Sequence, residues 1–256
     1  MILVEKQHMN EIPVLHLAQK DRYDAQLPLV IFEHGFTSAK ENNLHYAYLL
    51  AEKGMRVVLP EAAYHGERSA NLSTEQLAFR FWEIVVQSIG ELDTIRQYLE
   101  TRKFIDPSRI GLVGTSMGGI VTLGSLTQYH WVKAAVSLMG MPSYEKFALW
   151  QLETLKKKGV QLPVTQEAID QLLLKINTYD LSKNPKALNG RPLLFWHGKQ
   201  DPVVPFTYTY DFYQEIKPLY KNEPGKLQFI VDEKSGHKVS REGVLKTVEW
   251  FEQHLA

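Results

Sequence analysis

The sequence predicts an α/β protein with a mostly parallel central sheet and helices on both faces of that sheet. Short continuous apolar runs alternate along the chain with longer stretches of helical periodicity. Runs of this kind are typical of strands covered on both faces, and their alternation with helices favours right-handed crossovers between parallel strands. A further observation is one interval of about fifty residues, between Met139 and Leu193, which is too long for an ordinary loop.

The expected strands are apolar runs, taken here in chain order. They are 29–32, 57–59, 110–113, 134–138, 193–196 and 227–231. The stretches between and after these runs have apolar residues at helical spacing. The expected helices are 42–53, 74–100, 120–130, 206–220 and 241–255.

The long interval contains two helical patterns of its own. Apolar residues recur near helical spacing first at Tyr144, Phe147, Ala148, Leu152 and Leu155, and then at Ala168, Ile169, Leu172, Leu173 and Ile176. We interpret the interval as a small helical cap, at about 141–190, inserted into a single domain that spans residues 1–256. The alternative is a pair of ordinary helices that cover the sheet.

Composition and charge exclude several classes of protein. Lysine plus arginine equals aspartate plus glutamate at 29 each, so nothing suggests nucleic acid or an anionic membrane as a partner. The chain has no cysteine, which removes disulfides, thiolate nucleophiles and cysteine-ligated metals. Residues 1–7 fit no signal peptide, and no stretch approaches the roughly 18 apolar residues of a membrane span. We therefore expect a cytoplasmic protein.

The strongest chemical signal is Gly114-Thr115-Ser116-Met117-Gly118, which fits the pattern G-x-S-x-G. It lies between an expected strand and an expected helix, which is the context that the pattern requires. A sharp turn from strand to helix holds the serine in a strained conformation, and flanking glycines avoid the clashes that a Cβ atom would make. Ser116 is therefore the expected nucleophile, and the alternative is a purely structural turn.

A serine nucleophile needs a base, and the base needs an orienting carboxylate. Asp201 follows the run 193–196, at the end of a strand where open α/β sheets place their catalytic groups. His237 lies between the run 227–231 and the last helix, at the same end of the sheet. The order Ser, Asp, His along the chain is the order that the α/β-hydrolase fold uses. The alternative role of Asp201 is that of a turn residue before Pro202.

Other side chains compete for these roles. Three histidines lie in helical patterns, where surface positions are expected: His45, His130 and His254. His197 immediately follows an apolar run and is expected to be a packed histidine at a strand end. Asp232 and Glu233 are alternative orienting acids, but they lie so near His237 in sequence that a bond to its far ring nitrogen is hard to arrange.

A second donor for an oxyanion is expected in the loop Glu33-His34-Gly35-Phe36-Thr37, which follows the first expected strand. Gly35 lets the backbone turn its amides inward. The N–H of Phe36 would then face the N–H of Met117, at the start of a helix, across the attacked carbonyl group. The alternative is that this segment only ends a strand.

These residues resemble the α/β-hydrolase superfamily and, within it, the small cytoplasmic bacterial carboxylesterases of the YitV and YjfP type. The resemblance covers nearly the whole chain and rests on the segments 12–16, 30–38, 114–118, 193–198, 201–205 and 236–237. It implies carboxylesterase activity on simple acyl esters, with the triad on Ser116, Asp201 and His237. The segment 64–69 is similar to one that follows the next strand in the superfamily, and we interpret it, with Glu61 near the place of an acidic residue, as structural. The alternative is that it borders the acyl pocket.

The predicted function is that of a serine carboxylesterase, which hydrolyses short- to medium-chain carboxylic esters through an acyl-enzyme on Ser116. Its expected partner is a small-molecule ester; no cofactor and no metal are expected, and the sequence carries no signal for a particular oligomeric state. Four apolar residues would give the cap an apolar underside: Phe147, Trp150, Leu152 and Leu155. The alternatives are a peptidase or acyltransferase of the same superfamily and a non-catalytic ligand-binding protein of the same fold.

Overall fold

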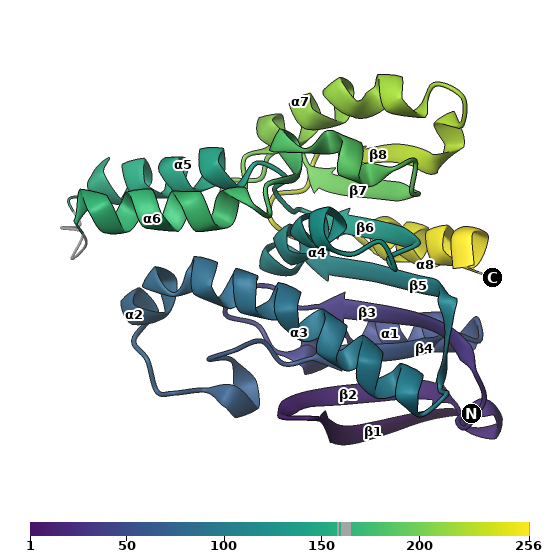
Figure 1. The fold of residues 1–256 in the computed structure, drawn as a ribbon. Helices are drawn as coiled ribbons and strands as arrows, with labels where there is room; N and C mark the ends of the chain where they lie inside the picture. The colour runs from purple at the N-terminus through teal and green to yellow at the C-terminus, as the bar shows by residue number, and fades with distance from the viewer. Residues whose placement is uncertain (158, 160–164, 256) are drawn as a thin grey trace.

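The computed structural model of this chain describes residues 1–157, 159 and 165–255. Strands form the centre of the molecule (Figure 1). They are β1 (Ile2–Met9), β2 (Ile12–Gln19), β3 (Leu27–Glu33), β4 (Arg56–Pro60), β5 (Ile105–Thr115), β6 (Ala134–Leu138), β7 (Leu193–Gly198) and β8 (Leu227–Asp232).

These strands form one eight-stranded sheet with the order β1-β2-β4-β3-β5-β6-β7-β8. The strands from β3 to β8 pair in parallel, and only β1 and β2 pair antiparallel to their neighbours within the described part of the chain. The predicted mostly parallel sheet is therefore confirmed, and the α/β-hydrolase fold with it.

The first two strands were not among the expected elements. β1 is an edge strand, and most of its residues are exposed or half-buried, so it has no continuous apolar run. β2 is almost fully buried, but Pro13 and His16 interrupt its apolar character. Its backbone pairs with β1 on one side and with β4 on the other. Neither pattern carries the signal that the buried parallel strands give.

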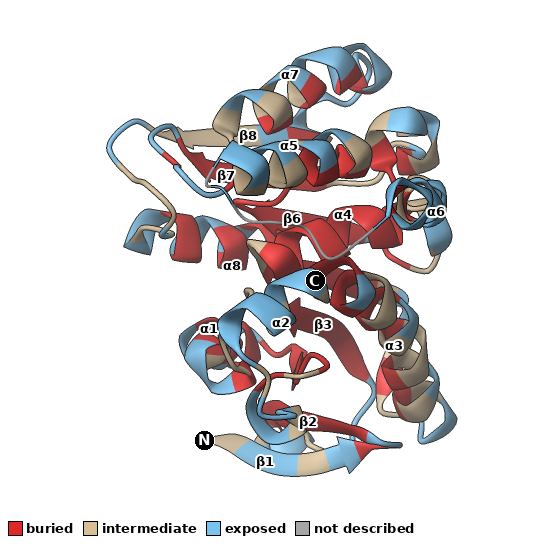
Figure 2. Cartoon of the chain, turned by 90° about the vertical axis from the view of Figure 1, so that its left-hand side faces the viewer, coloured by how far each residue is buried: buried red, intermediate tan, exposed pale blue. Residues whose placement is uncertain are grey.

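Helices cover both faces of the sheet, as predicted. They are α1 (Leu44–Glu52), α2 (Thr74–Phe79), α3 (Phe81–Thr101), α4 (Met117–Gln128), α5 (Tyr144–Lys157), α6 (Gln166–Asn177), α7 (Phe206–Ile216) and α8 (Arg241–Leu255). The alternation of side chains along β3 shows the two layers, because Val30 and Phe32 pack with α1 and α8, whereas Leu29 and Ile31 pack with α3, α4 and α7. Figure 2 shows the buried strands between helices whose outer sides are exposed.

The expected helix 74–100 is divided in the structure. α2 ends at Phe79 and α3 begins at Phe81, because Arg80 leaves helical geometry, with φ −91° and ψ 2°. α2 has a capping box of its own, in which Ser73 and Gln76 exchange side-chain and backbone hydrogen bonds. The two helices therefore begin independently, although apolar periodicity runs through both.

The interval between β6 and β7 contains α5 and α6, which correspond to the two helical patterns in the sequence. The two helices lie side by side and project beyond the ends of the parallel strands (Figure 1). Residues 158 and 160–164 of the expected cap lie outside the described residues. Among the helices of the described chain, none combines the length and apolar character needed to cross a membrane.

Candidate active site

Ser116 lies in a sharp turn between β5 and α4. Its backbone has φ 54° and ψ −114°, a conformation with positive φ that residues other than glycine rarely adopt. The end of β3 packs closely against this turn: a Cβ atom at Gly118 would lie only 2.1 Å from the carbonyl oxygen of Glu33. A Cβ atom at Gly114 would lie 2.2 Å from the backbone of Gly118. The turn therefore requires both flanking glycines, as the sequence pattern predicts.

The side chains of Ser116, His237 and Asp201 form a continuous hydrogen-bonded series. His237 Nε2 lies 2.8 Å from Ser116 Oγ, and His237 Nδ1 lies 2.7 Å from Asp201 Oδ2. The other carboxylate oxygen of Asp201 accepts the backbone N–H groups of Val203, at 2.8 Å, and Val204, at 2.9 Å. The structure thus brings together the three residues that the sequence predicts for the triad. Ser116 lies 121 residues before His237 in the sequence, and Asp201 lies 36 residues before it.

The protonation of these groups follows from their contacts. Burial raises the pKa of Asp201, but hydrogen bonds from His197, His237 and the backbone outweigh burial and hold the pKa well below its usual value. An ionised Asp201 can only accept, so His237 carries its proton on Nδ1. The unprotonated Nε2 then faces the hydroxyl group of Ser116, which is the arrangement that a general base needs.

The alternative acids do not contact His237. Asp232 accepts the backbone N–H groups of Lys234 and Ser235, and Glu233 forms an ion pair with Lys199. Of the other histidines, His45 and His130 are exposed as expected, whereas His254 is half-buried against Trp250. Of these three acids, Asp201 is the one that contacts the His237 ring.

His197 has a contact with the acid that the sequence interpretation missed. Its Nε2 lies 3.0 Å from the carbonyl oxygen of Val204 and 3.3 Å from Asp201 Oδ2. Both neighbours are acceptors, so Nε2 carries the proton and donates to them. The ring is fully buried, and its Nδ1 has no hydrogen-bond partner in the described part of the chain. The spacing of four residues between His197 and Asp201 was the available signal.

The loop around Phe36 packs against the turn that holds Ser116. A Cβ atom at Gly35 would lie 3.4 Å from the carbonyl oxygen of Thr115 and 3.6 Å from Ser116 Cβ. Within the described residues, neither the Phe36 N–H nor the Met117 N–H donates a hydrogen bond to protein. Two unpaired amides next to a serine hydroxyl can bind a negatively charged oxygen.

A buried ion cluster lies behind this loop. The carboxylate of Glu61 is fully buried and accepts a 2.7 Å hydrogen bond from the Lys40 ammonium, which also contacts Glu41 and Glu67. These three glutamates are the group among the described residues that lies close enough together to hold a cation. The Lys40 ammonium already supplies the positive charge there, so the donor set does not call for a metal.

Aromatic rings connect the loop around Phe36 with the interval between β6 and β7. The ring of Phe36 lies 5.4 Å from that of Phe81, and Phe81 lies 6.2 Å from Phe147 on α5. Phe147 in turn stacks on Trp150 at 5.6 Å. Phe147 and Trp150 of α5 therefore form an aromatic surface next to Phe81.

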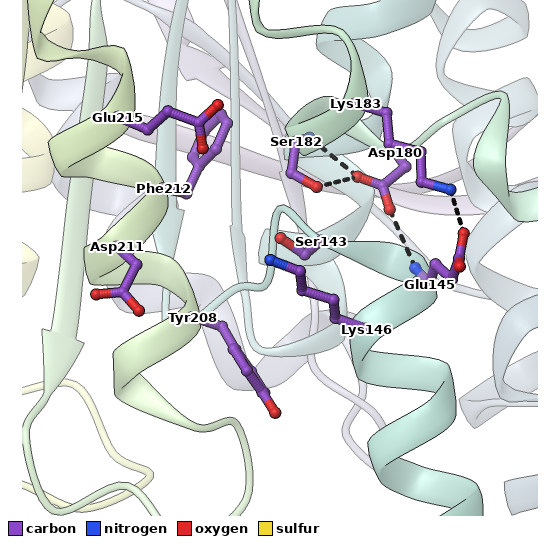
Figure 3. A pocket seen from close by; sticks show the side chains of 10 residues that line it. All are labelled: Ser143, Glu145, Lys146, Asp180, Ser182, Lys183, Tyr208, Asp211, Phe212 and Glu215. Carbon is purple, nitrogen blue, oxygen red and sulfur yellow. Dashed lines mark hydrogen bonds and ion pairs between the residues drawn. The ribbon is translucent and has the colours of Figure 1, made fainter.

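A polar pocket of about 270 Å³ lies at the base of α5, where that helix approaches α7 (Figure 3). Asp180 accepts the backbone N–H of Glu145 at 3.0 Å and that of Ser182, and Lys183 forms an ion pair with Glu145. Asp211 of α7 faces the pocket from the opposite side. Ser116, Asp201 and His237 do not line this pocket. It lies between α5, α7 and the segment 180–183.

Comparison with known proteins agrees with this geometry. A family model described as the prolyl oligopeptidase family matches residues 45–256. The chain belongs to this family. The predicted enzyme class, a serine hydrolase, is thereby confirmed.

Individual relatives support the same assignment. The chain is 51% identical over 255 residues to "Putative esterase YitV" of Bacillus subtilis, with 100% of both chains covered. It is 30% identical to "Esterase YjfP" of Escherichia coli, again with 100% of both covered. The crystal structure of TT1662 from Thermus thermophilus superimposes with a TM-score of 0.77 at 21% identity, covering 100% of this chain and 98% of the other, and it supports the fold. The resemblance stated from the sequence is therefore confirmed.

Proposed function

We propose that this member of the prolyl oligopeptidase family is a serine carboxylesterase for short- to medium-chain esters. The observation that carries the proposal is the series Ser116 Oγ, His237 Nε2, His237 Nδ1 and Asp201 Oδ2, with separations of 2.8 and 2.7 Å. A base bonded to the nucleophile and an ionised acid bonded to the base are what nucleophilic catalysis by serine requires. Relatives of full length that are named as esterases support the choice of substrate class.

The mechanism has two halves. His237 removes the proton of Ser116 while Oγ attacks the ester carbonyl carbon, and the carbonyl oxygen becomes an oxyanion held by the N–H groups of Phe36 and Met117. His237 then gives its proton to the departing alcohol, which leaves an acyl group on Ser116. Water enters, loses a proton to His237 and attacks the acyl carbon. The bond between the acyl carbon and Ser116 Oγ then breaks as His237 returns the proton to Oγ, so the carboxylic acid leaves and the serine hydroxyl is restored. Asp201 stays ionised and stabilises the cationic form of His237.

The interval 141–190 is proposed to act as a cap on a single domain, with α5 covering the acyl group. The aromatic series from Phe36 through Phe81 to Phe147 supports an apolar acyl site. An apolar wall stabilises each buried methylene by about 0.8 kcal/mol, whereas a charged acyl group would lose hydration there. These features support uncharged acyl chains, and the cytoplasmic location stays a prediction.

The first experiment is labelling with a fluorophosphonate, followed by mass spectrometry of the modified peptide. We expect one adduct on Ser116 in the native protein and none in Ser116→Ala. The Ser116→Ala protein should also lose at least about 10,000-fold in kcat on p-nitrophenyl esters. Labelling of a folded protein at another serine, or no labelling, would contradict the proposal and favour a binding protein of the same fold.

A panel of substrates then tests the class of the reaction. We expect p-nitrophenyl acetate, butyrate and octanoate to be hydrolysed, and the p-nitroanilides of the same three acids to react at least about 100-fold more slowly. Faster cleavage of the anilides would identify a peptidase. Transfer of the acyl group to an added alcohol in preference to water would identify an acyltransferase.

A further inference from the structure

Phe36 lies between two peptide groups whose orientations decide where its N–H points. The first peptide group contains the carbonyl of Gly35 and the N–H of Phe36. The second contains the carbonyl of Phe36 and the N–H of Thr37. Because a trans peptide is planar and its C=O and N–H point in opposite directions, fixing one end of each group fixes the other end.

His34 holds the first peptide group. Its Nδ1 lies 2.8 Å from the carbonyl oxygen of Gly35, which can only accept, so Nδ1 carries the proton. Its Nε2 accepts the backbone N–H of Ala62 at 3.0 Å. The ring is fully buried. With the Gly35 oxygen held by His34, the Phe36 N–H at the other end of the same plane points away from that ring.

His65 holds the second peptide group. The N–H of Thr37 donates to His65 Nε2 at 2.9 Å, and His65 Nδ1 donates to the carbonyl oxygen of Ala63 at 2.8 Å. His65 is buried, and Thr37 has a φ of 61°, a conformation that needs support from its surroundings. The ring must be neutral to accept the Thr37 N–H, and burial, with the nearby His34 ring, lowers the pKa of His65.

The two rings are themselves anchored to one rigid segment. They meet edge to face at 5.2 Å, and both bond to the backbone of residues 62–63, directly after β4. The charged neighbour of this pair is Glu61, whose Oε1 lies 3.3 Å from His34 Nε2 and whose other oxygen is held by Lys40. The loop is thus attached to the segment that follows β4 through two imidazole rings.

We propose that His34 and His65 are positioning residues, which hold the two peptide groups flanking Phe36 so that the Phe36 N–H is aimed at the developing oxyanion. The inference rests on the proposed esterase function, and it assigns a role to the His34-Gly35 and Tyr64-His65-Gly66 motifs. Neither ring touches the substrate. Each acts through one hydrogen bond to the backbone, and the two rings use opposite nitrogens for it.

This difference between the rings provides the test. An asparagine amide occupies roughly the place of Nδ1 in histidine, and a glutamine amide roughly the place of Nε2. His34→Asn therefore keeps the donor to Gly35, whereas His34→Gln does not. The order is reversed at the second ring, because His65→Gln keeps the acceptor for Thr37 and His65→Asn does not.

We expect a crossed pattern in kcat on p-nitrophenyl butyrate. His34→Gln and His65→Asn should lower kcat by about 10- to 100-fold, somewhat less than deleting an oxyanion donor outright, and leave KM within about threefold. His34→Asn and His65→Gln should recover most of the rate. His254→Asn, a half-buried histidine far along the chain, is the matched control and should not change kcat.

Several outcomes would overturn the inference. Equal kcat for the Asn and Gln variants at either position would mean that the rings only fill space. A parallel rise of KM would mean that they shape the binding site for the ground state. The final extent of fluorophosphonate labelling counts folded sites in every variant, so a loss of rate is not confused with loss of fold. A native protein that fails to label would instead contradict the proposed function itself.

Discussion

Clusters of polar groups lie at both ends of the parallel strands, and the two clusters differ in how many of their hydrogen-bonding groups have a partner. At the carboxyl ends lie Ser116, Asp201 and His237 with the loop around Phe36. At the amino ends lies Arg56, the first residue of β4, which is fully buried. Comparing the two clusters distinguishes polar groups that stabilise the fold from polar groups that remain available to bind a ligand.

The Arg56 cluster is closed. All three guanidinium nitrogens donate, to the carbonyl oxygens of Phe104, Tyr23 and Ala25 and to His16 Nε2. The carbonyl groups belong to the segments that lead into β5 and β3, so one side chain joins three strands. Burial and the charge of Arg56 lower the pKa of His16 to about 3, so His16 stays neutral and accepts.

The cluster at the carboxyl ends is open by comparison. The Phe36 and Met117 N–H groups and His197 Nδ1 have no hydrogen-bond partner among the described residues. An unsatisfied buried polar group destabilises the folded state by about 1 to 3 kcal/mol, and the backbone of Ser116 adds strain. An incoming oxygen atom can complete the hydrogen bonds of the Phe36 and Met117 N–H groups, whereas every guanidinium nitrogen of Arg56 already has an acceptor.

The largest expected effect that tests this comparison is on turnover, in Asp201→Asn. The amide presents an N–H to His237 Nδ1, which forces the wrong tautomer, and kcat should fall by about 10,000-fold. The free energy of unfolding should change by less than about 1.5 kcal/mol, because the Asn carbonyl still accepts the N–H groups of Val203 and Val204. Asp232→Asn is the control and should leave kcat within a few-fold of the native value. A small loss in Asp201→Asn would remove this residue from the triad.

Replacing Arg56 should have the opposite signature. Arg56→Met removes the side-chain donor from the carbonyl groups of Tyr23, Ala25 and Phe104, of which Phe104 keeps the backbone N–H of Leu27. It should lower the free energy of unfolding by about 3 to 5 kcal/mol. Measured well below the unfolding transition, kcat should stay within about twofold of the native value. Urea denaturation gives the first quantity, with the exposed Arg102→Met as control. A large loss of kcat in folded Arg56→Met would show that the two ends are coupled.

The contribution of the buried Glu61 carboxylate to the free energy of unfolding should depend on pH. Burial alone would raise its pKa, but the hydrogen bond from the Lys40 ammonium and the positive charge of that group hold the pKa well below its usual value. Because this lies below the ordinary value of 4.5, ionised Glu61 stabilises the folded state above pH 4.5, and its contribution disappears as the pH falls toward 2.

Glu61→Gln should therefore be less stable than the native protein at pH 7. The difference between the two proteins in the free energy of unfolding should shrink by about 2 to 3 kcal/mol as the pH falls from 4.5 toward 2. Urea denaturation at a series of pH values measures it. A difference that is constant with pH would mean that the carboxylate acts only through packing.

The parts of this molecule that the sequence predicts are those with local signals. The runs within β3 to β8 were recognisable because both faces of each strand are covered, and Gly114 and Gly118 mark a turn in which no Cβ fits. β1 escaped because its exposed edge carries no apolar run. The proposed roles of His34 and His65 escaped for another reason. Each ring makes one contact close in sequence and one contact 28 residues away, and each role depends on the ring tautomer; no sequence pattern records either feature.

The smallest expected effect belongs to α5, which lies at the open end but outside both polar clusters. Trp150 stacks on Phe147 and is half-buried, so Trp150→Ala removes apolar wall without touching the proposed triad. The ratio of kcat/KM for octanoate to that for acetate should fall by about 3- to 10-fold, because each methylene that loses its contact contributes at most about 0.8 kcal/mol. Leu174→Ala, on the exposed side of α6, is the control. An unchanged ratio would mean that Trp150 does not contact the acyl chain. Acyl selectivity would then come from residues nearer the sheet, such as Phe36 and Phe81.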